Sequence, residues 1–223
     1  MVTYDRQTVN SPNPIARFAH RTRLSKSILL ADKHLPCRGA VADFGAGNGY
    51  FLSALGDVRV DAVLYAIEPY MPPSADPRIQ YISDLRGTPR EFDVITALEV
   101  CEHLTDDQID IFLADCKKKL RADGKLIISV PIMIGAALPI KELSRTILFQ
   151  RRSDYSTSEI LLGLVCCDVQ RPEDRRPTHK GFDFRLLRKT LCKSFVIETE
   201  LYSPLPIPWW ANSQVFFVCR RLK

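Results

Sequence analysis

The chain has 223 residues, of which 46% are hydrophobic and 26% are charged, and its formal net charge is +5. This composition is typical of a globular protein and excludes disorder over most of the chain. The charge is too small to indicate a nucleic-acid partner, and we expect none, because no nucleic-acid-binding motif accompanies it.

The first part of the chain predicts a helix, a strand and a glycine loop. Asn13 as a cap and Pro14 at the first position indicate a helix over 14–34. Its expected apolar residues are Ile15, Phe18, Leu24, Ile28 and Leu29. A strand over 41–44 then runs into Gly45, Gly47 and Gly49, before a helix over 48–55. Because glycine reaches positive φ and lets a ligand approach the backbone, we expect a binding loop here.

Three further strands and one clear helix follow. The strands are expected over 62–67, 79–82 and 92–98. A capping box of Thr105 with Gln108 predicts the start of a helix. The apolar residues of that helix recur at helical spacing and are Ile109, Phe112, Leu113, Cys116 and Leu120. Gly124 is expected in the loop after the helix, before a strand over 125–130.

Strands alternate with helices from 41 to 130, which predicts a parallel sheet covered by helices on both faces. Residues 131–180 interrupt this pattern with two helical segments, near 140–151 and 156–167. A helix over 182–191 and strands over 195–201 and 214–220 complete the chain. Because no helix is expected between the last two strands, we expect them to pair antiparallel.

The spacing of the loop glycines separates two ligand classes. A dinucleotide-binding loop has the pattern G-x-G-x-x-G. Here Tyr50 stands at the third glycine position, and the spacing is G-x-G-x-G after Asp43. A nicotinamide-dependent oxidoreductase is therefore the weaker interpretation.

Five segments in sequence order resemble motifs of class I S-adenosylmethionine-dependent methyltransferases, in particular type 11-like small-molecule methyltransferases. They are residues 43–49, 64–69, 81–85, 92–104 and 124–131. The resemblance implies an α/β, Rossmann-like methyltransferase fold with helices on both faces of a seven-stranded, mostly parallel sheet. The last strand would be antiparallel, and a helical insertion would follow strand five. S-adenosyl-L-methionine is the implied cofactor, and a non-catalytic binding subunit with this fold is the alternative.

The resemblance assigns cofactor-binding residues to the strand ends. They are Asp43, Phe44, Gly45, Ala46, Gly47, Glu68, Asp84, Leu85 and Glu99. Ligands of open α/β sheets bind beyond the carboxyl ends of the strands, where these residues fall. We expect Glu68 to accept hydrogen bonds from the ribose hydroxyls and Asp84 to hold the adenine amino group. His20 and Arg23 of the N-terminal helix are interpreted as a solvated face, with a cover over the cofactor as the alternative.

Two histidines are candidates for the base that removes a proton from a hydroxyl nucleophile. His179 follows the insertion, in a stretch where substrate contacts often arise, and a surface-loop histidine is the alternative. His103 follows strand four in Glu102-His103-Leu104. A non-catalytic role is the alternative for His103.

We expect one methyltransferase domain in four parts. They are an N-terminal helical cap over 1–35, a cofactor-binding core over 36–130, a substrate-side insertion over 131–180, and a C-terminal helix and strand pair over 181–223. The family resemblance favours O-methylation of a small-molecule acceptor: a sugar, a lipid-linked glycan or a secondary metabolite. The apolar run 131–140 precedes the basic residues Lys141, Arg145, Arg151 and Arg152. Peripheral membrane contact through 131–152 therefore stands beside core packing as an interpretation, and the oligomeric state stays open.

The cysteines and the first residues bear on location. Seven cysteines have neither a metal-ligand spacing nor the pattern of a disulfide scaffold. The first residues lack the apolar core of a signal peptide. We therefore expect reduced thiols, a cytoplasmic protein and no bound metal.

Overall fold

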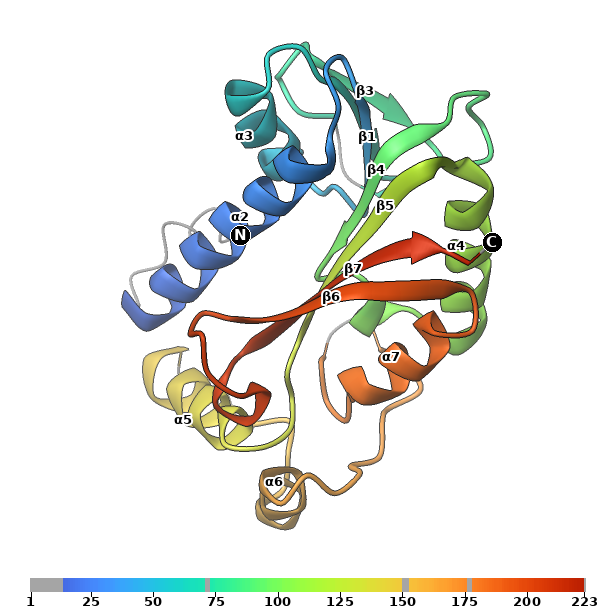
Figure 1. The fold of residues 1–223 in the computed structure, drawn as a ribbon. Coiled ribbons are helices and arrows are strands. Elements are labelled where there is room, and N and C mark those ends of the chain that lie inside the picture. Colours follow the sequence, from blue (N-terminus) through green and yellow to red (C-terminus); the bar gives the residue numbers. More distant parts are fainter. Residues whose placement is uncertain (1–13, 71–72, 150–152, 176–177, 223) are drawn as a thin grey trace.

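Seven strands form one sheet in the computed structural model, which describes residues 14–70, 73–149, 153–175 and 178–222 (Figure 1). The strands are β1 (Ala40–Phe44), β2 (Val63–Ile67), β3 (Ile79–Ile82), β4 (Phe92–Leu98), β5 (Leu120–Pro131), β6 (Phe195–Ser203) and β7 (Gln214–Arg221). Their order across the sheet is β3-β2-β1-β4-β5-β7-β6. Pairs among β1 to β5 are parallel, whereas β7 runs antiparallel between β5 and β6. The predicted fold class and the antiparallel last strand are therefore confirmed.

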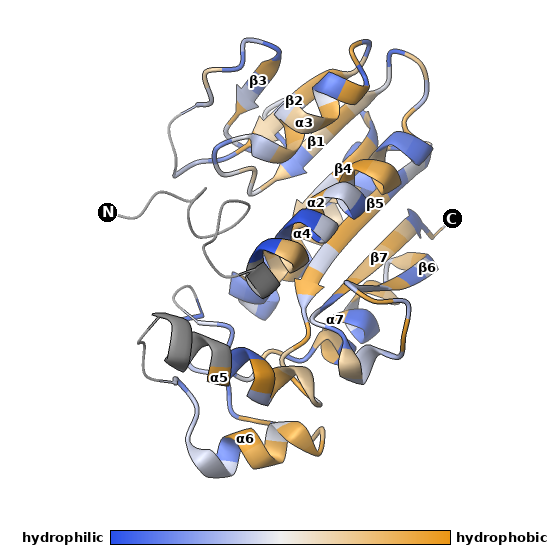
Figure 2. Cartoon of the chain, turned by 90° about the vertical axis from the view of Figure 1, so that its left-hand side faces the viewer, coloured by the Kyte–Doolittle hydropathy of each residue, from blue (hydrophilic) through white to orange (hydrophobic). Residues whose placement is uncertain are grey.

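Helices cover both faces of the sheet because alternate strand residues point to opposite faces. On β1, Val41 packs toward α2 (Pro14–His34) and α3 (Tyr50–Val58). Its neighbours Ala40 and Ala42 pack toward α4 (Asp106–Lys119) and α7 (Phe184–Leu191). The central strands are mostly apolar (Figure 2), as expected for parallel strands that are buried on both faces.

The insertion lies beyond the carboxyl ends of the parallel strands. It contains α5 (Ala137–Phe149) and α6 (Thr157–Leu164), and both lie at the end of the sheet that β5 leaves (Figure 1). A capping box of Ser156 with Glu159 begins α6, just as Thr105 and Gln108 begin α4. The helical insertion predicted after strand five is therefore confirmed.

The end of α4 differs from the sequence prediction. Leu120 has extended backbone angles and opens β5 instead of continuing the helix, because its buried side chain fills the sheet beside Phe92. The pairing then moves from Phe92–Leu120 to Val94–Lys125, so β5 carries extra residues at this point. Gly124 lies within that irregular strand and not in a separate loop.

The apolar face of α2 also differs from the prediction. Phe18 and Leu29 are exposed at 54% and 66%, whereas Leu30 and Ala31 are buried against the sheet. The predicted Leu24 and Ile28 do pack against the core, so the buried face of the helix overlaps the expected face but excludes Phe18 and Leu29. The predicted Asn13 cap and the Ile15 side chain lie outside the described residues.

The connection from β6 to β7 contains a short turn of 3-10 helix, η2 (Trp209–Ala211), where no helix was expected. Trp209 packs edge-on against Phe184 with ring centroids 5.6 Å apart, and Trp210 is 52% exposed. This turn holds the segment that enters β7 close to the insertion.

Candidate cofactor and acceptor site

The glycine loop is tied to the end of β2. Gly45, Gly47 and Gly49 all have positive φ, at 73°, 55° and 74°. The amides of Gly45 and Ala46 donate to the Ile67 carbonyl, at 2.9 Å and 3.4 Å. A Cβ at Gly45 would lie 2.6 Å from Val100 Cγ2, so this position accepts no larger residue without a shift. The loop keeps its shape because only glycine adopts these angles without strain.

Glu68 follows β2 and holds the backbone of the loop. Its Oε2 accepts a hydrogen bond from the Gly47 amide at 3.0 Å, and its Oε1 accepts one from the Tyr70 amide at 2.8 Å. Each carboxylate oxygen keeps a second lone pair for a ligand hydroxyl. The predicted carboxylate is therefore fixed beside the predicted loop.

Asp43 lies buried at the end of β1. The Thr96 hydroxyl donates to its Oδ1 at 2.6 Å. Burial, opposed by that hydrogen bond and reinforced by the charge of Glu68, raises the pKa of Asp43 to about 7. The carboxyl can therefore change its charge near neutral pH when a charged ligand arrives.

A cavity of about 200 Å³ opens above this loop. Five predicted cofactor residues line it: Asp43, Gly45, Ala46, Gly47 and Glu99. The other four do not. Phe44 packs on Phe112, Leu85 is buried in the core, Asp84 accepts a hydrogen bond from the Gly87 amide at 2.6 Å, and Glu68 accepts one from the Gly47 amide of the loop.

The N-terminal helix closes this cavity, and this corrects the interpretation of a solvated face. His20, Arg23, Leu24 and Ser27 of α2 line it together with the glycine loop. Burial, with the nearby charge of Arg23, lowers the pKa of His20 to about 4, so this imidazole is neutral at pH 7. The Nδ1 atom of His20 has no hydrogen-bond partner among the described residues.

Glu99 follows β4 and has a positive φ of 59°. Its amide donates to the Ser129 carbonyl at 2.9 Å, and its Oε2 pairs with the Arg23 guanidinium at 3.2 Å. Burial opposes ionisation, but the positive charges of Arg23, His179 and Lys141 hold the pKa of Glu99 below its ordinary value. Glu99 therefore stays ionised at the junction of two cavities.

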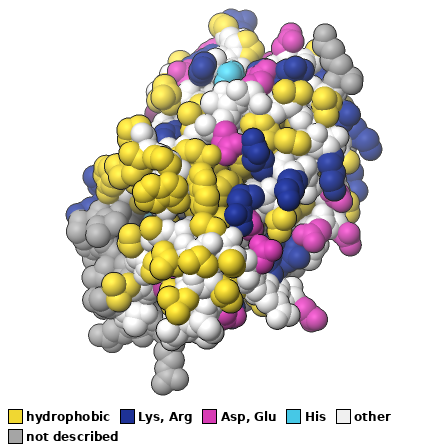
Figure 3. All heavy atoms as spheres, turned by 60° about the horizontal axis from the view of Figure 1, so that its bottom comes forward, with side chains coloured by type: hydrophobic (Ala, Val, Ile, Leu, Met, Phe, Trp, Pro, Cys, Tyr) yellow, Lys and Arg dark blue, Asp and Glu magenta, His cyan; other side chains and the backbone are white. Residues whose placement is uncertain are grey.

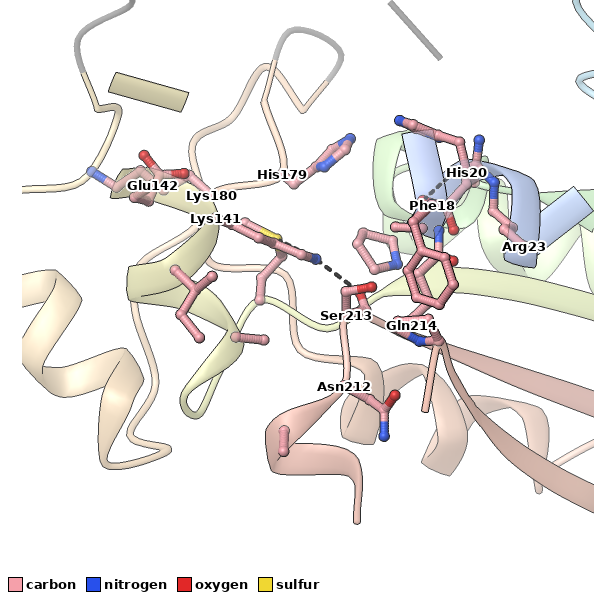
Figure 4. Close-up of a pocket in the computed structure, with 18 of the residues that line it drawn as sticks. Phe18, His20, Arg23, Lys141, Glu142, His179, Lys180, Asn212, Ser213 and Gln214 are labelled. Atoms are coloured by element: carbon pink, nitrogen blue, oxygen red, sulfur yellow. Dashed lines mark hydrogen bonds and ion pairs between the residues drawn. The ribbon is translucent and has the colours of Figure 1, made fainter. Parts of the chain in front are cut away.

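A second, larger cavity of about 500 Å³ adjoins the first. The two cavities share His20, Arg23 and Glu99. α2 supplies Phe18, His20 and Arg23 on one side, and Lys141 and His179 come from 131–180 on the other (Figure 4). The Lys141 ammonium donates to the carbonyls of Ile132 and Ser213, at 3.0 Å and 2.8 Å. Lys141 thereby joins the exit of β5 to the entry of β7.

The two candidate histidines lie in contact. The Nε2 atoms of His103 and His179 are 3.2 Å apart, and Glu102 Oε1 lies 3.9 Å from each. Burial and the charge of Glu99 raise the pKa of Glu102 well above its usual range. His179 lines the larger cavity, whereas His103 lies behind it.

Two arginines fix this contact across the insertion. Arg171 donates to the Glu102 carbonyl at 2.5 Å, and Arg175 donates to the Leu104 carbonyl at 2.9 Å. The sequence interpretation treated the histidines separately and missed Glu102. Only the adjacency of Glu102 and His103 could have indicated it.

The comparisons with known proteins give a family and a fold. A family model described as "Methyltransferase domain" matches residues 15–153, which is more than half of the chain. A search of curated proteins found no match.

Three solved structures illustrate the shared fold. The PH0226 protein from Pyrococcus horikoshii has 13% identity and a TM-score of 0.61, and the match covers 98% of this chain and 96% of that one. The 1,6-didemethyltoxoflavin-N1-methyltransferase from Burkholderia thailandensis has 18% identity, a TM-score of 0.56 and coverage of 92% and 80%. Mitomycin 7-O-methyltransferase has 16% identity and a TM-score of 0.55. There the match covers 96% of this chain but only 60% of the other.

Proposed function

The chain belongs to the methyltransferase-domain family and is an S-adenosylmethionine-dependent methyltransferase, and from this premise we propose that it methylates an oxygen atom of a small molecule. The observation that carries the proposal is the junction of the two cavities at His20, Arg23 and Glu99. A volume of about 500 Å³ lies within the range of about 300–1,000 Å³ typical of small-molecule sites. Because the chain belongs to this family, a nicotinamide-dependent oxidoreductase and a non-catalytic binding subunit are no longer alternatives.

The glycine loop and its flanking acids fit the cofactor. A Cβ at Gly45 would meet the Val100 side chain, so the loop backbone stays bare at this position, and each carboxylate oxygen of Glu68 keeps a free lone pair. We assign Asp43 and Glu99, which line the smaller cavity, to the methionine end. Glu68 is proposed for the ribose hydroxyls, and Asp84 and Leu85, which lie outside the lining of that cavity, stay candidates for the adenine from the family resemblance. Bound there, S-adenosylmethionine supplies a methyl group on a positively charged sulfonium. The ionised Glu99 favours that charge.

The imidazole pair supports transfer to a hydroxyl. His179 lines the larger cavity and can accept the proton of an acceptor hydroxyl. His103 Nδ1 lies 3.1 Å from the Arg175 carbonyl, which favours the tautomer with a proton on Nδ1 and a lone pair on Nε2. That lone pair faces His179 and accepts a hydrogen bond from the imidazolium that forms. We propose His179 as the base and His103 as its partner.

The acceptor is proposed to be a sugar, a lipid-linked glycan or a secondary metabolite. The larger cavity is lined by apolar side chains such as Met133 and Ile140 together with polar ones, among them Lys141, Lys180 and Glu142. Mitomycin 7-O-methyltransferase, a structural neighbour, is named for O-methylation of a small molecule. The division into parts over 1–35, 36–130, 131–180 and 181–223 stays a proposal. It is supported by the larger cavity, whose lining residues come from both the N-terminal cap and the insertion.

Membrane contact and the location of the protein in the cell stay proposals. Exposed apolar side chains gather on the face that carries the insertion (Figure 3), and Ile140 and Leu143 are exposed within 131–152, which supports peripheral membrane contact through this segment. Residues 150–152 lie outside the described part of the chain. Among the described helices, none is long and apolar enough to cross a bilayer. All seven cysteines are free, which supports the proposed cytoplasmic location.

Two measurements test the proposed function. S-adenosylmethionine should raise the melting temperature of the purified chain, whereas NAD should not. Mass spectrometry of extracts from cells with and without the protein should then reveal a metabolite that gains one CH₂. Degradation of that product should place the methyl group on oxygen; a methyl on nitrogen or carbon would overturn the O-methylation.

A further inference from the structure

Three side chains beside the acceptor cavity converge on one point. Glu102 and His103 come from η1 (Cys101–His103), the turn after β4, and His179 comes from the end of the insertion. We propose that Glu102, His103 and His179 form a binding site for a divalent transition-metal ion. This departs from the expectation of no metal, which rested on cysteine spacing alone.

The distances among the donor atoms suit a shared cation. The two Nε2 atoms are 3.2 Å apart, and each lies 3.9 Å from Glu102 Oε1. A point equidistant from three such atoms lies about 2.1 Å from each, close to the distances of about 2.0–2.2 Å at which Zn²⁺ binds imidazole nitrogen and carboxylate oxygen. An ion at that point would lie at bonding distance from all three donor atoms.

A direct hydrogen bond explains only part of this cluster. An N–H···N bond would account for the contact between the imidazoles. It does not account for Glu102, because 3.9 Å is too long for a hydrogen bond. The Glu102 side chain is fully buried, and neither of its oxygens accepts a hydrogen bond from another described side chain. A buried carboxyl without partners is costly, and a cation between it and the imidazoles would supply the missing partner.

Hydrogen bonds with neighbouring residues hold the proposed ligands in place, as is usual around metal ligands in proteins. The Arg175 carbonyl lies 3.1 Å from His103 Nδ1, which leaves Nε2 to bind an ion. Arg171 fixes the backbone of Glu102 through its carbonyl. Arg175 is itself held by Asp106 at 2.8 Å. The segments that carry the donors are therefore joined by contacts independent of the ion.

The donor set indicates the class of metal. Two imidazoles and one carboxylate suit Zn²⁺, Fe²⁺, Co²⁺ or Mn²⁺, whereas Mg²⁺ prefers oxygen ligands alone. Three protein ligands also leave coordination positions open, as in catalytic zinc sites. Because His179 lines the acceptor cavity, we infer that an open position faces the acceptor.

This inference rests on the proposed function and deepens it. A cation at this point would bind the acceptor hydroxyl and lower its pKa, and the proton would pass to a water molecule in the cavity. In that state the two imidazoles act as ligands, and His179 no longer needs to accept the proton. The acceptor class would then be a hydroxyl compound whose oxygen can reach a metal.

Metal binding is measurable without the acceptor. The full chain is stripped with a chelator, dialysed, and titrated with Co²⁺ while its visible absorption is recorded. We expect one Co²⁺ per chain, a d–d spectrum of low coordination number, and competition by Zn²⁺. His179→Ala and Glu102→Gln should weaken binding by more than about tenfold, since even outer-contact losses cost about 10–100-fold. His34→Ala, at the far end of α2, should bind as the unaltered chain does.

Three results would overturn the site. One is a folded, chelator-stripped chain that takes up no Co²⁺ or Zn²⁺. Another is a folded His179→Ala chain with the same Co²⁺ stoichiometry and spectrum as the unaltered chain. A chain that binds Mg²⁺ but no transition metal would also overturn the site. Circular dichroism establishes folding for each variant. If methyl transfer to oxygen persists in excess chelator while Co²⁺ binding fails, the proposed function stands and only the metal site falls.

Discussion

Arg23 of α2 and Glu99 after β4 form an ion pair with 3.2 Å between Nη1 and Oε2, where the proposed cofactor and acceptor cavities meet. The two side chains are only 15% and 17% exposed. The pair therefore fixes the helical cap to the core at the point where both ligands are expected to meet.

Arg23→Ala should leave Glu99 as a buried charge with a weaker set of partners. We expect a loss of about 1–3 kcal/mol in the free energy of unfolding at pH 7, below the roughly 3–5 kcal/mol of fully buried pairs. Because the folded pKa of Glu99 is lowered, its contribution is present above its ordinary pKa and is lost as the pH falls through the folded value. Urea unfolding at several values from pH 7 down to pH 3 should show the loss shrink below the ordinary pKa of a glutamate, whereas the exposed Arg21→Ala should change little at any pH.

Glu68→Ala should remove the acceptor of two backbone amides and the proposed ribose contact together. Affinity for S-adenosylmethionine should fall by about 1–3 kcal/mol, the range for unpaired buried polar groups. Glu68→Gln keeps one acceptor oxygen and should lose less. Calorimetric titration measures this, with the exposed Glu91→Ala as the control. Equal affinity in all three variants would remove Glu68 from the cofactor site.

Gly45→Ala should disrupt the loop through two separate effects. The φ of 73° costs an L-residue about 1–2 kcal/mol, and the new Cβ would lie 2.6 Å from Val100 Cγ2. We expect lower stability and weak cofactor binding. Gly87→Ala meets no atom closer than 3.5 Å and should be tolerated. Adding Val100→Ala to Gly45→Ala should recover the part due to the clash; no recovery would assign the whole effect to the backbone.

Local signals explain how much of the fold could be predicted. The Thr105–Gln108 capping box satisfies amides within one turn of chain, so the sequence of that turn decides where α4 begins. The loop around Gly45 needs positive φ, which glycine alone signals. The end of α4 could not be predicted in this way. Leu120 suits a helix or a strand equally, and its contact with Phe92 across the sheet decided the outcome.

The contacts of the site that escaped prediction are all distant in sequence. Whether Arg23 reaches Glu99 depends on the rotation of α2, and the exposed Leu29 shows that apolar spacing alone does not define that rotation. The contact of His103 with His179 depends on how the insertion folds back, which Arg171 and Arg175 determine through backbone carbonyls. No local pattern encodes such bonds.

Asp43 predicts a pH dependence of cofactor binding. Its folded pKa of about 7 lies above the ordinary value, so its contribution to stability is present at low pH and is lost as the pH rises through about 7. The positive sulfonium favours the ionised carboxylate. Affinity for S-adenosylmethionine should therefore rise between pH 6 and pH 8, by at most about tenfold per pH unit. Asp43→Asn should flatten this rise and should be more stable than the unaltered chain at pH 8; an unchanged slope would exclude Asp43.

His179→Ala tests whether His179 acts on the acceptor without affecting cofactor binding. His179 lines the acceptor cavity and not the cofactor cavity, so turnover should fall while the Kd for S-adenosylmethionine stays the same. A fall of about 10²–10⁴-fold is expected for loss of a proton-accepting group. As the partner of the base, His103 acts through its 3.2 Å contact with His179, so His103→Ala should lower turnover less; equal losses would favour the metal site, where both imidazoles are ligands. His34→Ala is the control for removal of an imidazole elsewhere. Full turnover in His179→Ala would mean that the acceptor hydroxyl loses its proton without this side chain, and the assignment of the base would then be wrong.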